Sequence, residues 1–141
     1  MERLYPQDID LHTLSPLALA FVGDGVYSLM VRERLLSQAN RPVNDLHKLA
    51  VKAVRAEAQS AAMDRLLPLL TEEEEAYFKR GRNLGHTNVP KRATVSDYRT
   101  ATGMEVLFGY LHLTGQKERI GQLFTIAYAT EEASQDILSS T

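Results

Sequence analysis

Two carboxylates lie where the sequence is otherwise apolar, and they are the residues best placed to do chemistry. Asp24 stands between Gly23 and Gly25 inside an apolar segment with helical character. Glu105 stands between two apolar side chains in a second such segment. Removing a carboxylate from water without a partner is costly, so each needs a cation, a metal ion or several hydrogen-bond donors. Oxygen ligands of this kind suit Mg²⁺ or Mn²⁺.

Each carboxylate also has an ordinary structural explanation when it is taken alone. Asp24 would pair with a core-facing arginine or cap another helix, and Glu105 would pair with a basic residue on a solvated face. However, the two glycines beside Asp24 weaken a helix by up to about 1 kcal/mol each, which favours a close approach to the backbone there. Small or polar residues share the face of Glu105 at helical spacing, namely Thr102, Gly109 and His112. Together the carboxylates indicate a site between packed helices and metal-dependent phosphodiester chemistry.

Basic side chains gather in one part of the chain. Residues 79–92 include five lysines and arginines, one histidine (His86) and no acid. Cations at the C-terminus of a helix are favourable in themselves, so helix capping is the alternative explanation. The number of bases exceeds what capping needs, and we therefore predict that they contact RNA phosphates. The predicted contacts are Lys79, Arg80, Arg82, Lys91 and Arg92.

A second basic stripe is less specific. Lys48, Lys52 and Arg55 have the spacing of one helix face, which a plain solvated surface explains equally well. A histidine in the place of His47 is usually a hydrogen-bonding residue, and the functional alternatives are a residue that supports the metal ligands and an RNA contact. We include His47 and Lys48 among the predicted RNA-binding residues. The acidic run over residues 72–75 is interpreted as a solvated helix start without chemistry.

Composition and charge limit the class of protein. The chain has 141 residues and no cysteine, which excludes disulfides, zinc–cysteine sites and thiol nucleophiles. The net charge of −2 argues weakly against a nucleic-acid partner, but the bases and acids are segregated along the chain. No export signal and no membrane-spanning run is expected. We predict a single domain over residues 1–141, with its core at about 14–129 and a short tail.

Turn residues divide the chain into lengths typical of helices. Ser15 followed by Pro16 predicts the first helix start, and this helix is apolar nearly all round, which favours burial. Thr71 followed by Glu74 predicts a capping box. No segment alternates with the period of a strand, so the fold class is all-α. The predicted helices cover about 16–37, 44–66, 71–82, 96–113 and 116–129, with a short helical or frayed tail after the last.

Four segments, in this order, resemble the ribonuclease III family in its Mini-III form, which consists of the catalytic domain alone. Leu17–Tyr27 (LALAFVGDGVY) resembles the family's signature helix, and Asn44–Lys48 resembles the start of its second helix. Thr71–Asn83 resembles the acidic-to-basic third helix. Tyr98–Leu111 resembles the helix that bears the second acidic residue. The resemblance covers nearly the whole chain, from about residue 14 to 127.

The resemblance implies a fold, an activity and a set of partners. The fold is the ribonuclease III endonuclease-domain helical bundle, a homodimer packed through the signature helix. Asp24 and Glu105 match the catalytic, metal-binding acids, with Mg²⁺ as cofactor and Mn²⁺ as a substitute. The substrate is double-stranded RNA, cut to 5′-phosphate and 3′-hydroxyl ends. Precursor ribosomal RNA of the 23S type, a cytoplasmic location and a ribosomal protein as a further partner follow from the same resemblance.

Several positions depart from the family's patterns. Long-form enzymes carry carboxylates at the positions of Leu17, Ala20 and Thr102, and Mini-III forms share these losses. Ser28 stands where both forms usually have Glu, and Gly25 stands where Ala is usual. Ser28 supplies no charge, which would alter a metal-site or dimer contact. The chain leaves no length for a double-stranded-RNA-binding domain, so the catalytic dimer must bind RNA by itself.

Two other classes of function remain open from the sequence. A catalytically silent homologue would be a helical dimer that binds structured RNA as a scaffold, and the small number of carboxylates and Ser28 favour it. A protein-interaction module without RNA would fit the near-neutral charge. Retained RNA binding without metal-dependent cleavage distinguishes the first, and failure to bind duplex RNA at low salt distinguishes the second.

Overall fold

The computed structural model describes residues 3–84 and 94–139, with side chains as far as residue 128. Within these residues there are only helices, so the all-α prediction is confirmed. None of the described helices has the length and apolar character needed to cross a membrane. Two short 3₁₀ turns, η1 (Leu11–Thr13) and η2 (Leu67–Leu69), accompany the α-helices. These are α1 (Pro16–Gln38), α2 (Val43–Ala53), α3 (Ala56–Leu66), α4 (Glu72–Arg82), α5 (Val95–Leu113) and α6 (Lys117–Ser139).

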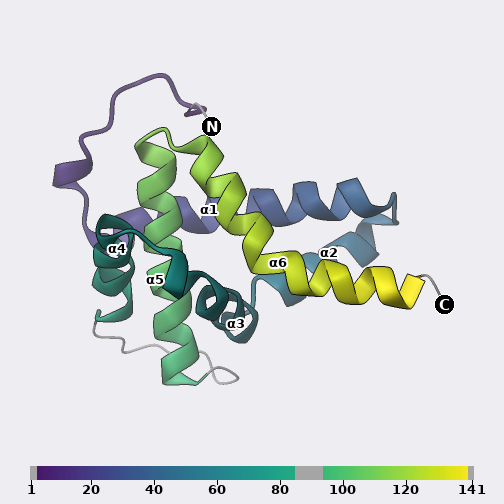
Figure 1. Cartoon of the computed structure of the whole chain (residues 1–141). Helices are drawn as coiled ribbons and strands as arrows, with labels where there is room; N and C mark the ends of the chain where they lie inside the picture. The colour runs from purple at the N-terminus through teal and green to yellow at the C-terminus, as the bar shows by residue number, and fades with distance from the viewer. Residues whose placement is uncertain (1–2, 85–93, 140–141) are drawn as a thin grey trace.

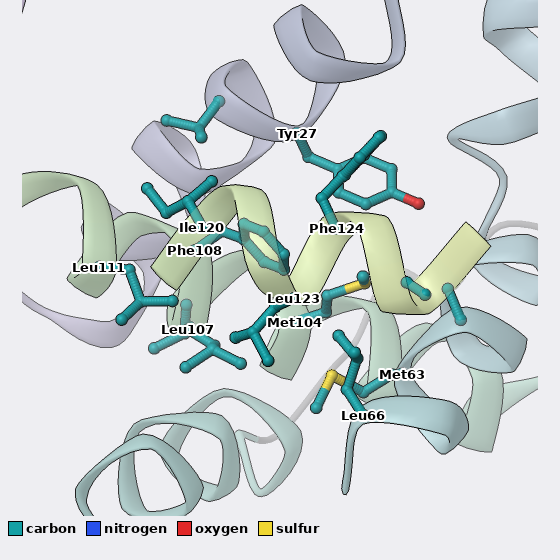
Figure 2. Packing of buried hydrophobic residues seen from close by; sticks show 14 of the residues in the cluster. Tyr27, Met63, Leu66, Met104, Leu107, Phe108, Leu111, Ile120, Leu123 and Phe124 are labelled. Atoms are coloured by element: carbon teal, nitrogen blue, oxygen red, sulfur yellow. The ribbon is translucent and has the colours of Figure 1, made fainter. Parts of the chain in front are cut away.

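Helix α5 is the centre of the fold. It packs against α1, α3, α4 and α6, and Figure 1 shows it running between α4 and α3. Nearly every side chain from Ala101 to His112 is buried, because neighbours cover the helix on most sides. The core combines side chains of α5 with side chains of α1, α3, α4 and α6, and Figure 2 shows part of it. Its most completely buried members include Tyr27, Met63, Leu66, Leu107, Phe108, Leu111, Ile120 and Leu123.

Helix α1 begins as predicted but is buried on only one side. The Ser15 side chain accepts a hydrogen bond from the Ala18 backbone N–H at 3.1 Å, and Pro16 follows at the first helical position. The expectation of burial all round is wrong for this single chain, because Leu17 is 60% exposed and Phe21 is 72% exposed. The opposite side packs on α5 and supplies buried residues such as Tyr27. One apolar face of α1 is therefore left uncovered.

The predicted helix over residues 44–66 is two helices. The helical conformation is interrupted after Val54, and Arg55 adopts an extended conformation as the N-cap of α3. Arg55 is therefore not part of one continuous stripe with Lys48 and Lys52. The break has a packing reason: α2 buries no residue completely, whereas α3 carries Met63 and Leu66 into the core against α5. Apolar periodicity over the whole stretch hid this change of direction.

Helix α4 confirms the capping box and corrects the interpretation of the acidic run. Thr71 Oγ1 accepts from the Glu74 N–H at 3.2 Å, and the Glu74 carboxylate accepts from the Thr71 N–H at 2.9 Å. Glu74 is not solvated, however, since it is only 3% exposed. Arg119 of α6 donates to both of its oxygens, each at 2.8 Å. This buried ion pair fastens the start of α4 to the start of α6.

The last two helices differ from prediction at one end each. Helix α5 begins at Val95 rather than at Ser96, and its N-cap is Thr94, whose hydroxyl accepts a hydrogen bond from the Asp97 N–H at 3.0 Å. Helix α6 continues without a break to Ser139, ten residues beyond the predicted end at 129, so the predicted tail takes the helical alternative as part of α6. The additional stretch contains no glycine or proline to stop it.

Candidate active site

The backbones of α1 and α5 touch at two glycines. A Cβ atom added to Gly23 would lie 1.7 Å from the Glu105 carbonyl oxygen, and one added to Gly109 would lie 2.1 Å from the Leu19 carbonyl oxygen. Any larger residue would force the helices apart. The carboxylates are neighbours of this crossing, since Asp24 directly follows one glycine and Glu105 lies one turn before the other. The crossing therefore brings Asp24 and Glu105 together, as predicted.

The two glycines that flank Asp24 have different roles. Gly23 is buried against α5, which confirms the expectation of a close backbone approach. Gly25 is exposed, and a Cβ added there would meet no atom of the described chain within 4 Å. Within one chain, therefore, nothing requires glycine at this second position.

The electrostatics of the pair differ from those of an ordinary surface. Asp24 is exposed, whereas Glu105 is half-buried on the α1 side of α5. Burial, reinforced by the negative charge of Asp24, raises the pKa of Glu105 to about 7. Neither carboxylate forms a hydrogen bond or ion pair with any described side chain, so the arginine partner and the basic neighbour considered above are both wrong for this part of the chain. A site that penalises negative charge in this way favours a bound cation.

The donor set fits a magnesium ion better than a softer metal. Among the described residues no group of three or more histidines, aspartates or glutamates is arranged to hold a metal. Two carboxylates suffice for Mg²⁺, which commonly keeps several waters and takes further oxygens from a substrate phosphate. Asp24 and Glu105 are the residues that could hold it.

Three positions at which long-form ribonuclease III enzymes carry carboxylates have no carboxylate in this chain. Ala20 is buried and contributes only a methyl group. Thr102 is 6% exposed, and its hydroxyl donates to the Tyr98 carbonyl one turn earlier at 3.0 Å. Leu17 is directed to the exposed apolar face of α1. Among the described residues, these three positions therefore add no carboxylate to Asp24 and Glu105.

The face of Glu105 also carries a buried histidine. His112 is 8% exposed, and its Nδ1 atom has no hydrogen-bond partner among the described residues. Burial, together with nearby positive charge that includes Arg3, lowers the pKa of His112. A neutral imidazole at this position is part of the packing where α5 ends, two turns beyond Glu105.

The predicted RNA contacts fall on two helices and a segment outside the described residues. Lys79, Arg80 and Arg82 end α4, and Lys91, Arg92 and His86 lie outside the described residues. Lys48 is exposed on α2. His47 lines an apolar hollow of about 230 Å³ between α1 and α2, beside Leu36 and Val43.

Sequence reasoning missed one residue beside these contacts. Tyr77 lies beneath Arg80, with the guanidinium carbon 4.7 Å from the ring centroid. Their spacing of three along a helix was the available signal. A tyrosine and an arginine at that spacing are common, and only the packing of α4 on α5 shows that this ring is fixed.

Comparison with known proteins places this geometry in a family. Residues 17–116 match the model of the ribonuclease III domain. A protein of Thermoanaerobacter sp. named Mini-ribonuclease 3 is 48% identical over 115 residues, which cover 82% of this chain and 81% of that protein. The chain belongs to the ribonuclease III family. An Enterococcus faecalis Mini-ribonuclease 3 is 47% identical over 116 residues, covering 81% of this chain and 88% of the relative.

A solved structure agrees with this assignment. The X-ray crystal structure of a protein from Fusobacterium nucleatum superposes with a TM-score of 0.78 at 30% sequence identity, over 86% of this chain and 98% of that one. Both the recognition of a Mini-III ribonuclease and the expected helical fold are thus confirmed. Membership of the ribonuclease III family makes the chain an endoribonuclease.

Proposed function

We propose that this endoribonuclease hydrolyses double-stranded RNA at a divalent metal ion held by Asp24 and Glu105. One observation carries the proposal: the Gly23–Gly109 crossing brings together two carboxylates for which the described chain provides no cation. Membership of the ribonuclease III family supports double-stranded RNA as the substrate class. Mg²⁺ is the proposed ion, and Mn²⁺ would substitute for it.

The two carboxylates divide the work between them. Glu105 is half-buried and held by the packed α5 helix, so it fixes the inner side of the site. Asp24 is exposed and reaches the side from which a substrate phosphate approaches. A bound Mg²⁺ would lower the pKa of a water and neutralise charge on the phosphate under attack. The attacking water oxygen bonds to phosphorus as the bond to O3′ breaks, which leaves a 5′-phosphate and a 3′-hydroxyl.

The uncovered face of α1 supports a homodimer. Leu17 and Phe21 expose large apolar side chains at i, i+4 spacing, and burial of such a face is favourable. A second copy related by a two-fold axis would cover it and place two carboxylate pairs in one particle. Sedimentation at micromolar concentration should give the mass of two chains. A single-chain mass would contradict the dimer without affecting the assignment of the carboxylates.

The RNA surface combines the predicted bases of two regions. We propose that phosphates contact Lys79, Arg80 and Arg82 on α4, and His47 and Lys48 on α2. Lys91 and Arg92, which lie outside the described residues, are proposed RNA contacts on the basis of the sequence. A-form RNA displays phosphates and 2′-hydroxyls across a shallow minor groove, so recognition depends mainly on shape. Binding should weaken steeply with salt.

The proposal also includes the natural RNA substrate and the place where the enzyme acts. Similarity to Mini-III ribonucleases supports maturation of precursor ribosomal RNA of the 23S type, in the cytoplasm, with a ribosomal protein as a further partner. Removal of the chain from its host should then cause precursor ribosomal RNA to accumulate. Unchanged ribosomal RNA ends would contradict this setting and leave the nuclease proposal intact.

The decisive experiment is cleavage of labelled duplex RNA by purified protein, with and without Mg²⁺. The wild type should cut only with the ion, and Asp24→Asn should leave the RNA intact. Asp64→Asn is the matched control, because it makes the same chemical change at an exposed carboxylate on α3. Intact RNA with every protein, together with a retarded protein–RNA band, would instead support the silent scaffold.

A further inference from the structure

The three bases that end α4 differ in what already holds them. Lys79 forms an ion pair with Glu75 at 2.9 Å. Arg82 is half-buried, and its Nε donates to Asn83 Oδ1 at 3.2 Å. Arg80 is exposed and makes no hydrogen bond or ion pair with any described residue. Of the three, Arg80 alone has a guanidinium with all its donors open to a ligand.

Arg80 is nevertheless not a loose side chain. Its guanidinium carbon lies 4.7 Å from the centroid of the Tyr77 ring, within the range of a cation–π contact. The Tyr77 ring is itself stacked on Tyr110 of α5, with centroids 4.0 Å apart and planes inclined by 10°. Because Tyr110 covers one face of the Tyr77 ring, the guanidinium lies over the other. Both rings are buried, at 9% and 6% exposure, so the platform beneath Arg80 is fixed.

The backbone that carries Arg80 is fixed as well. A Cβ added to Gly81 would lie 2.7 Å from the Gly103 Cα, which shows that the end of α4 rests directly on α5. One turn before Gly81, the Phe78 ring packs over Gly103. The Arg80 side chain is thus held at its root by a close helix contact and at its tip by an aromatic face.

We propose that Arg80 is the anchor that binds an RNA phosphate at the end of α4, and that Tyr77 is its positioning residue. This inference rests on the proposed duplex-RNA function. A stacked guanidinium presents its N–H groups at its edge, where a phosphate accepts two of them side by side. Stacking orders the side chain before binding, so less conformational entropy is lost in the complex. Lys79 must first leave Glu75, and it therefore contributes less although it carries the same charge.

The test compares substitutions that remove the same charge. Affinity for a labelled duplex RNA is measured by fluorescence anisotropy in EDTA, where nothing is cut. Arg80→Ala should weaken binding about tenfold and reduce the salt slope by about one. Lys79→Ala, the matched control, should weaken it about twofold. Arg80→Lys keeps the charge without the planar fork, and it should resemble Arg80→Ala more than the wild type.

The positioning role of Tyr77 has a separate readout. Tyr77→Leu leaves Arg80 in place but removes its platform, and it should weaken binding about threefold with an unchanged salt slope, because the number of phosphate contacts stays the same. Tyr77→Phe keeps the ring and should restore most of the affinity. Thermal unfolding of each variant identifies any that fail to fold, and the Phe variant then decides between a platform and a core residue.

The outcomes separate the anchor from the function beneath it. Equal losses of affinity for Arg80→Ala and Lys79→Ala, or wild-type affinity in Arg80→Lys, would overturn the proposal that Arg80 is the anchor. The proposed duplex-RNA function would still stand if the wild type bound the RNA. A wild type that does not bind duplex RNA at low salt would overturn both.

Discussion

Glu74 and Glu105 are two carboxylates removed from water by the same fold, and their surroundings are opposite. Glu74 accepts hydrogen bonds from Arg119 and Thr71, and these, the Arg119 bonds first, lower its pKa below the ordinary value. Glu105 has no such donor among the described residues, and burial beside Asp24 raises its pKa to about 7. The first region joins α4 to α6, and the second lies where α1 crosses α5.

The difference shows how burial of one residue type serves two purposes. A carboxylate with an arginine and a backbone N–H is satisfied and holds elements together. A carboxylate whose only charged neighbour is another carboxylate is destabilised in its ionised form, and a bound cation relieves it. At Asp24 and Glu105, folding thus leaves negative charge without a positive partner from the described chain, and a bound cation can supply that partner.

The largest expected effect on stability comes from breaking the satisfied pair. Arg119→Ala should lower the free energy of unfolding by about 3–5 kcal/mol, because it leaves the Glu74 charge buried without its main partner. In the wild type, the contribution of Glu74 is present above its unfolded pKa and is lost as pH falls through the lower folded value. Urea unfolding from pH 3 to 7 should therefore show a flatter acid limb in the variant. An unchanged acid limb would mean that this pair does not govern acid stability.

Glu105→Gln should have the opposite effect on stability. The folded pKa of about 7 lies above the usual 4.5, so the folded state holds the proton more tightly and loses stability as pH rises between these values. Without metal, at pH 8, the variant should be more stable than the wild type by up to about 3 kcal/mol. Cleavage should nevertheless fall by more than about 100-fold, because the variant removes one of the two carboxylates proposed to hold the metal ion.

The matched comparison for this result is Glu74→Gln, measured in the same buffer. It should destabilise at pH 8, where Glu105→Gln stabilises. If both variants were destabilised equally, the contrast between the two carboxylates would be wrong.

A smaller effect is expected at the cap that supports Glu74. Thr71→Ala removes the hydroxyl that accepts from the Glu74 N–H, and such caps contribute about 1 kcal/mol. The loss should be well below that of Arg119→Ala in the same urea titration. A loss as large as that of Arg119→Ala would show that the cap, not the ion pair, dominates at this end of α4.

The smallest of these effects is expected on the pKa of Glu105 in the variant Asp24→Asn. Asp24 is only the second cause of the raised pKa of Glu105, after burial. The variant should therefore shift the carboxyl titration of Glu105, followed by ¹³C NMR, down by less than burial has raised it. A return of this pKa to the ordinary value of an exposed glutamate would show that charge repulsion, rather than burial, controls the site.

The sequence predicted the all-α fold class and most of its helices, and it named Asp24 and Glu105 as the candidate site. Local signals were sufficient for the Ser15–Pro16 start and the Thr71 capping box. The two acids in apolar surroundings were visible in the sequence, but their proximity depends on the crossing of α1 and α5. The break at Arg55 was not predictable, because α2 and α3 continue the same apolar period while turning to different neighbours. Glu74 looked like one of four equivalent acids, and its partner Arg119 lies 45 residues away. The aromatic platform beneath Arg80 likewise depends on Tyr110 from another helix.

By itself, the sequence determined the all-α class, the caps at Ser15 and Thr71 and the presence of two acids in apolar surroundings, since these depend on neighbours within one or two turns. Only the tertiary structure decided what each buried charge would meet. Gly23 and Gly109 set the distance between α1 and α5, and that distance leaves Glu105 facing Asp24. The packing of α6 instead gives Glu74 an arginine. Desolvation and charge pairing depend on what lies around a carboxylate in space, and residue type alone does not specify it.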